Sequence, residues 1–315
     1  MGATHKQMHI DKMLSEFAVN YKPEGFIADT IFPTEPVQKQ SDLYATFSRA
    51  DKLRSENDKR AAGTEARKID LSIGSGTYYA NNYALKYGVT IEDKANADPI
   101  FVQHLINARA EFIMDKLLLN MEKRVANLVT SGSNVGSYTA VASGWGGSGD
   151  PLGDLNAAID NVHYSNGLMP NKIVMGVEAW KTFRRDSTVR NLIFGSNNGG
   201  GYPNTAQVAA LLDIDEVMVG GAFQNTTDEG QDESLSSIWA DNVLVYYAPP
   251  SPSIERPSLG YNLRWTGAGL PNMQAERHPY NSRTKSEEVE IGYYQDEKLV
   301  APSYGFLLSA VNSST

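Results

Sequence analysis

Residues 98–130 read DPIFVQHLINARAEFIMDKLLLNMEKRVANLVT and form the clearest helical pattern in the chain. Asp98 is a good N-cap and Pro99 suits the first helical position, so a helix is predicted to begin here. No helix breaker follows before about Thr130, and apolar residues recur at three- and four-residue steps. At about 1.5 Å per residue, this helix would be a rod roughly 50 Å long. Such a rod is longer than a small domain is wide, so it is predicted to be a spine that links distant regions.

The sequence before the spine alternates in the manner of β-strands. Residues 44–48 and 68–74 each alternate, and residues 79–91 place tyrosine and aliphatic side chains on one face at period two. Tyrosines can stack nucleic-acid bases, but this stripe has only one interleaved cation, so a plain strand face is the better interpretation. The segment between the first two strands is polar and too poor in apolar residues to fold onto its own core. It predicts a long charged hairpin tip that either stays in solvent or rests on a partner.

The first forty residues contain a short amphipathic piece, residues 10–17, followed by FIADTIFPTEPVQKQ at residues 26–40. Pro33 and Pro36 oppose a helix in the second piece and favour an extended strand. Its apolar side chains need a surface to cover. The segment is therefore predicted to be either an arm laid over another chain or the first strand of the same domain.

The pattern changes after the spine. Residues 131–150 are rich in Gly and Ser and are predicted to be a loop, whereas helices and strands alternate from Pro151 onward, as in a compact α/β subdomain. PPSPS at residues 249–253 predicts a turn or linker. The remainder is strand-like. The predicted helices are residues 152–164, one from about 178, and 205–212; the predicted strands are 172–177, 216–219, 243–247, 288–293 and 299–311, with a turn at 296–298.

Composition limits the function further. With 315 residues, 41% hydrophobic and 21% charged, the chain has the composition of an ordinary globular protein. Its 28 Lys plus Arg against 37 Asp plus Glu give a net charge of -9, which argues against non-specific DNA binding by the surface as a whole. The absence of Cys excludes disulfides, thiolate zinc sites and a cysteine nucleophile. The N-terminal residues lack the apolar core of a secretory signal, and Pro302 interrupts the longest late apolar run, so no membrane association is predicted.

The sequence contains one weak motif for a cofactor-binding site. Gly144, Gly146 and Gly149 match the spacing of a dinucleotide-binding loop, but the segment before them does not read as a buried strand. A flexible linker after the spine is the preferred interpretation, and an oxidoreductase stays open as a remote alternative.

No other pattern predicts a catalytic residue, a cofactor or a metal. The acidic loop at residues 228–233 lacks the spacing of a calcium site. Glu287, Glu288 and Glu290 could suggest paired acids, but on a strand Glu288 and Glu290 simply share the wet face. The histidines are scattered and complete no ligand set, and they are His5, His9, His104, His163 and His278. The chain is therefore predicted not to be an enzyme.

The order of the elements resembles the HK97-type major capsid protein of tailed bacteriophages. Three segments carry the resemblance: FIADTIFPTEPVQKQSDLY at residues 26–44, GTYYANNYALKYGVTIED at residues 76–93, and EEVEIGYYQDEKLVAPSYGFLLSAV at residues 287–311. The pattern covers nearly the whole chain. It implies an α+β fold with an N-arm at residues 1–42, an E-loop hairpin at 43–78, a P-domain from 79–150 and 270–315, and an α/β A-domain at 151–269.

The resemblance also implies what such a chain does. Copies would assemble into pentamers and hexamers of an icosahedral head that encloses double-stranded DNA without sequence-specific binding, in the virion after assembly in the host cytoplasm. The E-loop cations would meet acidic surface on an adjacent subunit. These candidate contact residues are Arg49, Lys52, Arg54, Lys59, Arg60 and Arg67.

Further partners implied by the resemblance are a separate scaffolding protein, a portal and a decoration protein. Some family members cross-link through an E-loop lysine, but Lys52 and Lys59 identify no cross-linking pair here, and none is predicted. An encapsulin-like shell and a tail or baseplate component are the structural alternatives.

Overall fold

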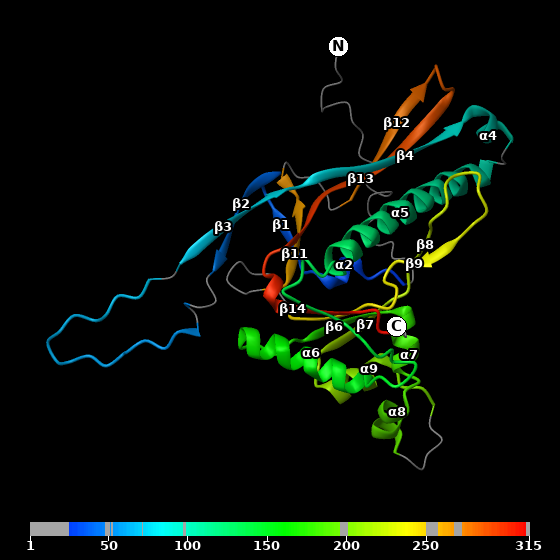
Figure 1. The fold of residues 1–315 in the computed structure, drawn as a ribbon. Coiled ribbons are helices and arrows are strands. Elements are labelled where there is room, and N and C mark those ends of the chain that lie inside the picture. Colours follow the sequence, from blue (N-terminus) through cyan, green and yellow to red (C-terminus); the bar gives the residue numbers. More distant parts are fainter. Residues whose placement is uncertain are drawn as a thin grey trace.

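The computed structural model describes residues 25–47, 51, 53–70, 72–96, 99–195, 201–249, 258–267 and 273–312. Its frame is a long helix, α5 (Pro99–Val129), that lies along one sheet and leads down toward a second, as Figure 1 shows. We call these the first sheet and the second sheet. The spine predicted from the sequence is thus confirmed.

Two buried stretches of α5 serve two different cores. Ala110, Ile113, Met114 and Leu117 pack with Val289 and other residues of the first sheet. One to three turns later, another cluster contains residues of the second sheet, such as Leu244 and Leu307, packed against Met121, Val125, Ala126 and Val129. Burial of one such side chain stabilises the fold by about 1.5–3 kcal/mol, so the helix joins the two sheets through apolar packing along its length.

The first sheet is built around one very long strand. β13 (Ser286–Leu299) pairs along its length with β4 (Asn81–Thr90) on one edge and, on the other, with β12 (Gln274–Asn281) and then β11 (Gly260–Trp265). β1 (Thr34–Val37) extends the sheet next to β11. The turn predicted at residues 296–298 is wrong, because Asp296 pairs with Leu263 and the strand continues to Leu299. Pairing with a distant strand overrode the local turn signal.

The second sheet has the order β5-β14-β10-β6-β7 and contains the predicted α/β alternation. The predicted strand at 299–311 is shorter than expected, because the turn η3 (Pro302–Tyr304) precedes it, and the loop predicted at 131–150 contains a strand, β5. Helix α8 was not predicted. The strands are β5 (Ser137–Ala140), β14 (Gly305–Ser309), β10 (Val243–Tyr246), β6 (Lys172–Gly176) and β7 (Glu216–Gly220); the helices are α6 (Pro151–Asn166), α7 (Val177–Phe183), α8 (Ser187–Phe194) and α9 (Thr205–Leu212).

The segment with two prolines lies against its own chain. A one-turn helix, α2 (Ala28–Ile31), ends just before Pro33, so the prediction of an uninterrupted extended strand is wrong. Its Ile31 and neighbouring Phe32 are fully buried, and β1 follows with parallel pairing to β11. For residues 26–40, the interpretation as part of the same domain is confirmed. The amphipathic piece at residues 10–17 lies outside the described residues.

Two hairpins and a short helix lie outside the two main sheets. β2 (Ser41–Phe47) and β3 (Ile73–Tyr79) pair antiparallel and form the base of a long hairpin, residues 41–79. The second strand begins later than the predicted 68–74. β8 (Phe223–Asn225) and β9 (Leu235–Ser237) flank the acidic loop, and α4 (Ile91–Asn96) precedes α5.

A buried carboxylate joins three parts of the fold. Glu122, on α5, is fully buried and accepts hydrogen bonds from Ala28 N at 2.8 Å, from Ile27 N at 3.1 Å and from the indole N–H of Trp239. The two backbone donors are the free N–H groups at the start of α2. Glu122 therefore caps a helix that precedes it by more than 90 residues and also holds the loop before β10.

An arginine network, two residues after Glu122, joins α5 to the first sheet. Arg124 donates to both carboxylate oxygens of Glu297 and to the Tyr293 hydroxyl, and its guanidinium lies 3.7 Å from the centroid of the Tyr83 ring. Burial acts against the charge of Arg124, but Glu297 and Tyr293 favour it, and the net effect raises the pKa. The Glu297 side chain is only 6% exposed, so it depends on Arg124 for compensation.

We expect Glu122→Ala to lower the free energy of unfolding by about 3 kcal/mol, because three buried donors lose their acceptor. Glu122→Gln keeps the volume and one acceptor oxygen and should cost about 1–2 kcal/mol. Denaturant unfolding measures both changes. Glu111→Gln, on the exposed face of the same helix, is the control and should behave as the wild type.

The stability contributed by Glu122 should depend on pH. Burial raises the pKa of its carboxyl in the folded state, although the hydrogen bonds from Trp239, Ala28 and Ile27 lower it. The folded state therefore binds more protons than the unfolded state, and this contribution falls as pH rises through the folded-state pKa. Relative to Glu122→Gln, the wild type should gain stability as pH is lowered from about 7.5 to about 5. Unfolding of both proteins across this range checks the sign, and a constant difference would contradict it.

Arg124→Met should destabilise the fold by about 3 kcal/mol, because it leaves the Glu297 carboxylate buried without its partner. Arg124→Lys should lose less, since a positive charge stays but the two-pronged contact is lost. Lys123→Met changes an exposed neighbour and is the matched control. If thermal unfolding finds Arg124→Met as stable as Lys123→Met, the network does not hold the helix on the sheet.

Candidate assembly surface

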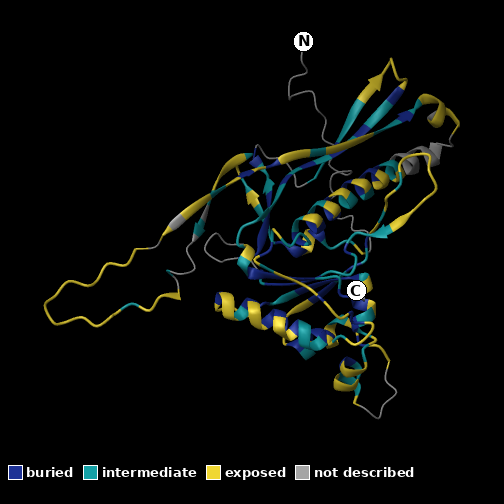
Figure 2. Ribbon diagram, viewed as in Figure 1, coloured by how far each residue is buried: buried dark blue, intermediate teal, exposed yellow. Residues whose placement is uncertain are grey.

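The long hairpin extends away from both sheets and is exposed along most of its length, as Figures 1 and 2 show. Three of its apolar side chains are among the most exposed of the described residues: Leu43 at 63%, Leu53 at 61% and Ile69 at 70%. A hairpin of this kind buries too little of its own surface to hold one conformation by itself. These exposed apolar side chains are available for contact with another surface.

The base of the hairpin is firmly anchored. Tyr78 is buried with Tyr261 and Leu263, and its hydroxyl donates to the Lys39 carbonyl oxygen at 3.0 Å. Asp296, on β13, accepts from Tyr79 N at 3.1 Å. The first sheet thus sets the direction in which the hairpin leaves the molecule.

The candidate cations are distributed along the hairpin rather than gathered at one point. Arg54 lies 3.6 Å from Asp51, Arg67 lies 3.2 Å from Glu56, and Arg60 donates from Nε to the Thr64 carbonyl oxygen. Lys59 is exposed, whereas Arg49 and Lys52 lie outside the described residues. Sequence reasoning identified the cations but missed the exposed Leu43, Leu53 and Ile69. Isolated apolar residues in a polar segment were the signal that could have revealed them.

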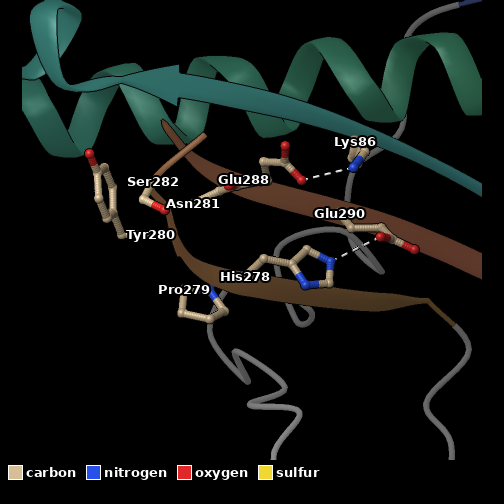
Figure 3. A pocket seen from close by; sticks show the side chains of 8 residues that line it. All are labelled: Lys86, His278, Pro279, Tyr280, Asn281, Ser282, Glu288 and Glu290. Atoms are coloured by element: carbon tan, nitrogen blue, oxygen red, sulfur yellow. Dashed lines mark hydrogen bonds and ion pairs between the residues drawn. The ribbon is translucent and has the colours of Figure 1, made fainter. Parts of the chain in front are cut away.

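A shallow depression on the first sheet is lined by two acidic residues of β13, Glu288 and Glu290 (Figure 3). Glu288 pairs with Lys86 of β4 at 2.8 Å, and Glu290 lies 2.9 Å from Nε2 of His278 on β12. The hydrogen bond from Lys86 lowers the pKa of Glu288. Each carboxylate thus has its own cross-strand partner, an arrangement that stabilises a sheet surface and offers no acid–base pair.

The glycine-rich loop does not form a dinucleotide site. Trp145 is buried within it, and its indole donates to Asp154 at 2.8 Å, while the backbone N–H of Gly149 donates to the Gly144 carbonyl oxygen. The Asp150 carboxylate caps α6 by accepting from Gly153 N at 3.0 Å. A negative group thus occupies the position that a pyrophosphate would need. The loop is also held by the fold through these contacts, so the interpretation as a flexible linker is wrong.

The tyrosine stripe and His163 make contacts within their own chain. Arg109 lies 4.4 Å from the Tyr87 ring centroid, and this tyrosine also makes an edge contact with Phe112, so the strand-face interpretation of the tyrosine stripe is confirmed. His163 stacks on Tyr164 at the end of α6. His5, His9 and the side chain of His104 lie outside the description. Among the described residues, no group of three His, Asp or Glu could hold a metal ion, and no helix is long and apolar enough to cross a membrane.

The chain is similar to phage capsid proteins over its full length. It is 22% identical over 324 residues to a major capsid protein of Burkholderia phage BcepMu, covering 99% of this chain and all of the relative. It is 25% identical over 311 residues to a major capsid protein of Pseudomonas phage JBD67, covering 94% and 95% of the two chains. No family model matches the sequence.

Solved structures show the same fold. A phage-related protein of Bordetella bronchiseptica superposes with a TM-score of 0.76 at 22% identity, covering 98% of this chain and 99% of the other. The capsid of cyanophage P-SCSP1u gives a TM-score of 0.60 at 12% identity, with 93% and 90% covered. In sequence the chain is thus similar to phage major capsid proteins over nearly its whole length, and its mixed α+β fold matches HK97-type capsid structures.

Proposed function

We propose that pentamers and hexamers of this chain form the closed head that encloses a double-stranded DNA genome, and that the long hairpin links neighbouring subunits within it. As a major capsid protein, the chain assembles with copies of itself into a shell. The observation that carries the proposal is a hairpin anchored rigidly at its base but uncovered beyond it, with Leu43, Leu53 and Ile69 exposed. A second copy would supply the missing surface.

The direction of the hairpin supports a ring. It leaves one side of the molecule, whereas its complement must lie elsewhere on the neighbour, because a hairpin cannot cover itself (Figure 1). Contacts between different surfaces of identical subunits are head-to-tail, and they close into rings when the rotation allows. Pentamers and hexamers are such rings.

The proposed regions follow the predicted boundaries with a structural refinement. Residues 1–42 would be the N-arm, 43–78 the E-loop, 79–150 with 270–315 the P-domain, and 151–269 the A-domain. The sheets cross these boundaries: β11 pairs into the first sheet, and β5 and β14 pair into the second. We therefore propose that the P-domain contains the first sheet with α5, and the A-domain the second sheet with its helices.

Charge supports the proposed hairpin contact. The chain carries a net charge of -9, yet the hairpin holds the cations Arg49, Lys52, Arg54, Lys59, Arg60 and Arg67. On an acidic neighbour these residues would provide orientation and register more than affinity. A separate scaffolding protein, a portal and a decoration protein complete the proposed set of partners.

Negative-stain electron microscopy tests the proposal. The protein is purified alone and after coexpression with the genes that neighbour its own. Closed icosahedral particles built of rings are expected, with DNA inside when the genome-packaging proteins are present. Small discrete oligomers in both preparations would contradict the proposal.

Removing hairpin charge should slow assembly. We expect Arg54→Gln with Lys59→Gln to lower the assembly rate at low salt by roughly 10-fold, because charge complementarity acts mainly on association. The effect should fade as salt rises. Light scattering during assembly measures the rate.

The matched control is Asp58→Asn with Glu65→Gln, which removes two exposed acids from the same hairpin. Assembly of this control should be as fast as wild type or faster. Equal slowing in both pairs would show that the sign of the hairpin charge is irrelevant.

A further inference from the structure

A second cationic region lies at the opposite end of the molecule from the β12–β13 hairpin. Residues 181–190 read KTFRRDSTVR and span the end of α7 and the first part of α8. Figure 1 places α8 at the lower extremity, away from the first sheet. This decapeptide contains four cations and one acid in a chain with a net charge of -9. Together with Tyr202, we call these cations the axial patch: Lys181, Arg184, Arg185, Arg190 and Tyr202.

Tyr202 gathers two of the arginines at one aromatic ring. The Arg184 guanidinium carbon lies 4.9 Å from the ring centroid, and that of Arg190 lies 5.4 Å from it. Both distances are within the range of cation–π attraction. The ring itself is 53% exposed, and the two arginines that contact it are half-buried.

The backbone beneath the patch is rigid. Phe183 and Val189, which flank the turn between α7 and α8, are both fully buried in the core of the second sheet. The single acid, Asp186, is engaged in capping α8, because its carboxylate accepts from Thr188 N at 2.8 Å and Val189 N at 3.0 Å. Within the described part of the chain, no ion pair joins Lys181, Arg184 or Arg185 to a carboxylate. The fold therefore positions Lys181, Arg184 and Arg185 without an ion pair to a described carboxylate.

We infer that the axial patch binds the phosphate backbone of DNA. Guanidinium groups match phosphate oxygens with paired hydrogen bonds, and the contact with Tyr202 restricts the orientations of Arg184 and Arg190 before binding. The inference rests on the proposed function, in which the shell encloses DNA. A ring of subunits repeats the patch, so weak contacts at single subunits add up along one DNA molecule.

The strength of this contact is limited by its composition. Four cations allow at most about four phosphate contacts in each chain, and the chain as a whole carries a net charge of -9. The binding is thus local and of moderate salt dependence, which suits a shell that holds DNA without immobilising it.

An acidic surface of a second copy is the competing occupant. The loop between β8 and β9 offers Asp228, Glu229, Asp232 and Glu233. Phosphate is favoured because the patch combines planar guanidinium groups with a half-exposed aromatic ring, the combination found where proteins contact nucleic acid.

The test is fluorescence anisotropy of a labelled 20-base-pair duplex with the unassembled protein, measured from about 50 to about 200 mM salt. Arg184→Gln with Arg190→Gln should weaken binding roughly 10-fold and reduce the slope of log affinity against log salt by about two. Tyr202→Ala should weaken binding, and Tyr202→Phe should preserve it. Because Lys181 and Arg185 are exposed, Lys181→Gln with Arg185→Gln removes two charges without disturbing the fold and should also reduce the slope.

Arg54→Gln with Lys59→Gln removes the same charge from the long hairpin and should leave DNA binding unchanged. The inference is overturned if the wild type does not bind the duplex, or if the axial-patch variants bind as the wild type does. It is also overturned if these variants keep DNA binding but no longer form rings, since the patch would then contact a second copy. A different result would contradict the proposed function alone. In that case the wild-type protein binds DNA through the patch but never forms closed particles.

Discussion

The Glu122 carboxylate is the contact on which the arrangement of the other parts depends. It lies in the last third of α5, is closed off from solvent, and accepts from the start of α2 and from Trp239. An unpaired charge in that position would be very costly, so the fold is stable only with all these donors in place. The need to satisfy one buried group thus sets the position of α2 and β1, which lead into the long hairpin.

The molecule combines this well-packed core with a long hairpin that projects from it. Arg124 and the two apolar stretches of α5 hold the helix on both sheets, and Tyr78 fixes the base of the hairpin. Beyond that base, Leu53 and Ile69 remain exposed. A rigid base with an uncovered extension is what a subunit needs in order to reach a neighbour in a defined direction. In the proposed shell, assembly buries the apolar side chains that folding leaves exposed.

The cations of the hairpin and of the axial patch lie in two separate regions of the molecule. The chain is acidic as a whole, yet it has one group of cations in the hairpin and another in the axial patch at the far end of the second sheet. Because salt screens charges within about 10 Å at 0.1 M, the two regions act independently of each other. One region is suited to an acidic neighbour and the other to phosphate, and neither makes the whole surface attractive to DNA.

By itself, the sequence determined the elements whose signals are local. The helix from Pro99 to Val129 could be predicted because its cap, its lack of breakers and its apolar period all lie within one segment. The charged hairpin and the α/β alternation were predictable for the same reason, and the order of these elements was enough to indicate the capsid family. Only the tertiary structure decided that Asp296 lies within a strand, that the glycine loop closes around Trp145, and that Glu122 caps α2. It also brought Tyr202 to Arg184 and Arg190. Each of these depends on a partner distant in the chain or on the packing around it, and no local pattern contains that information.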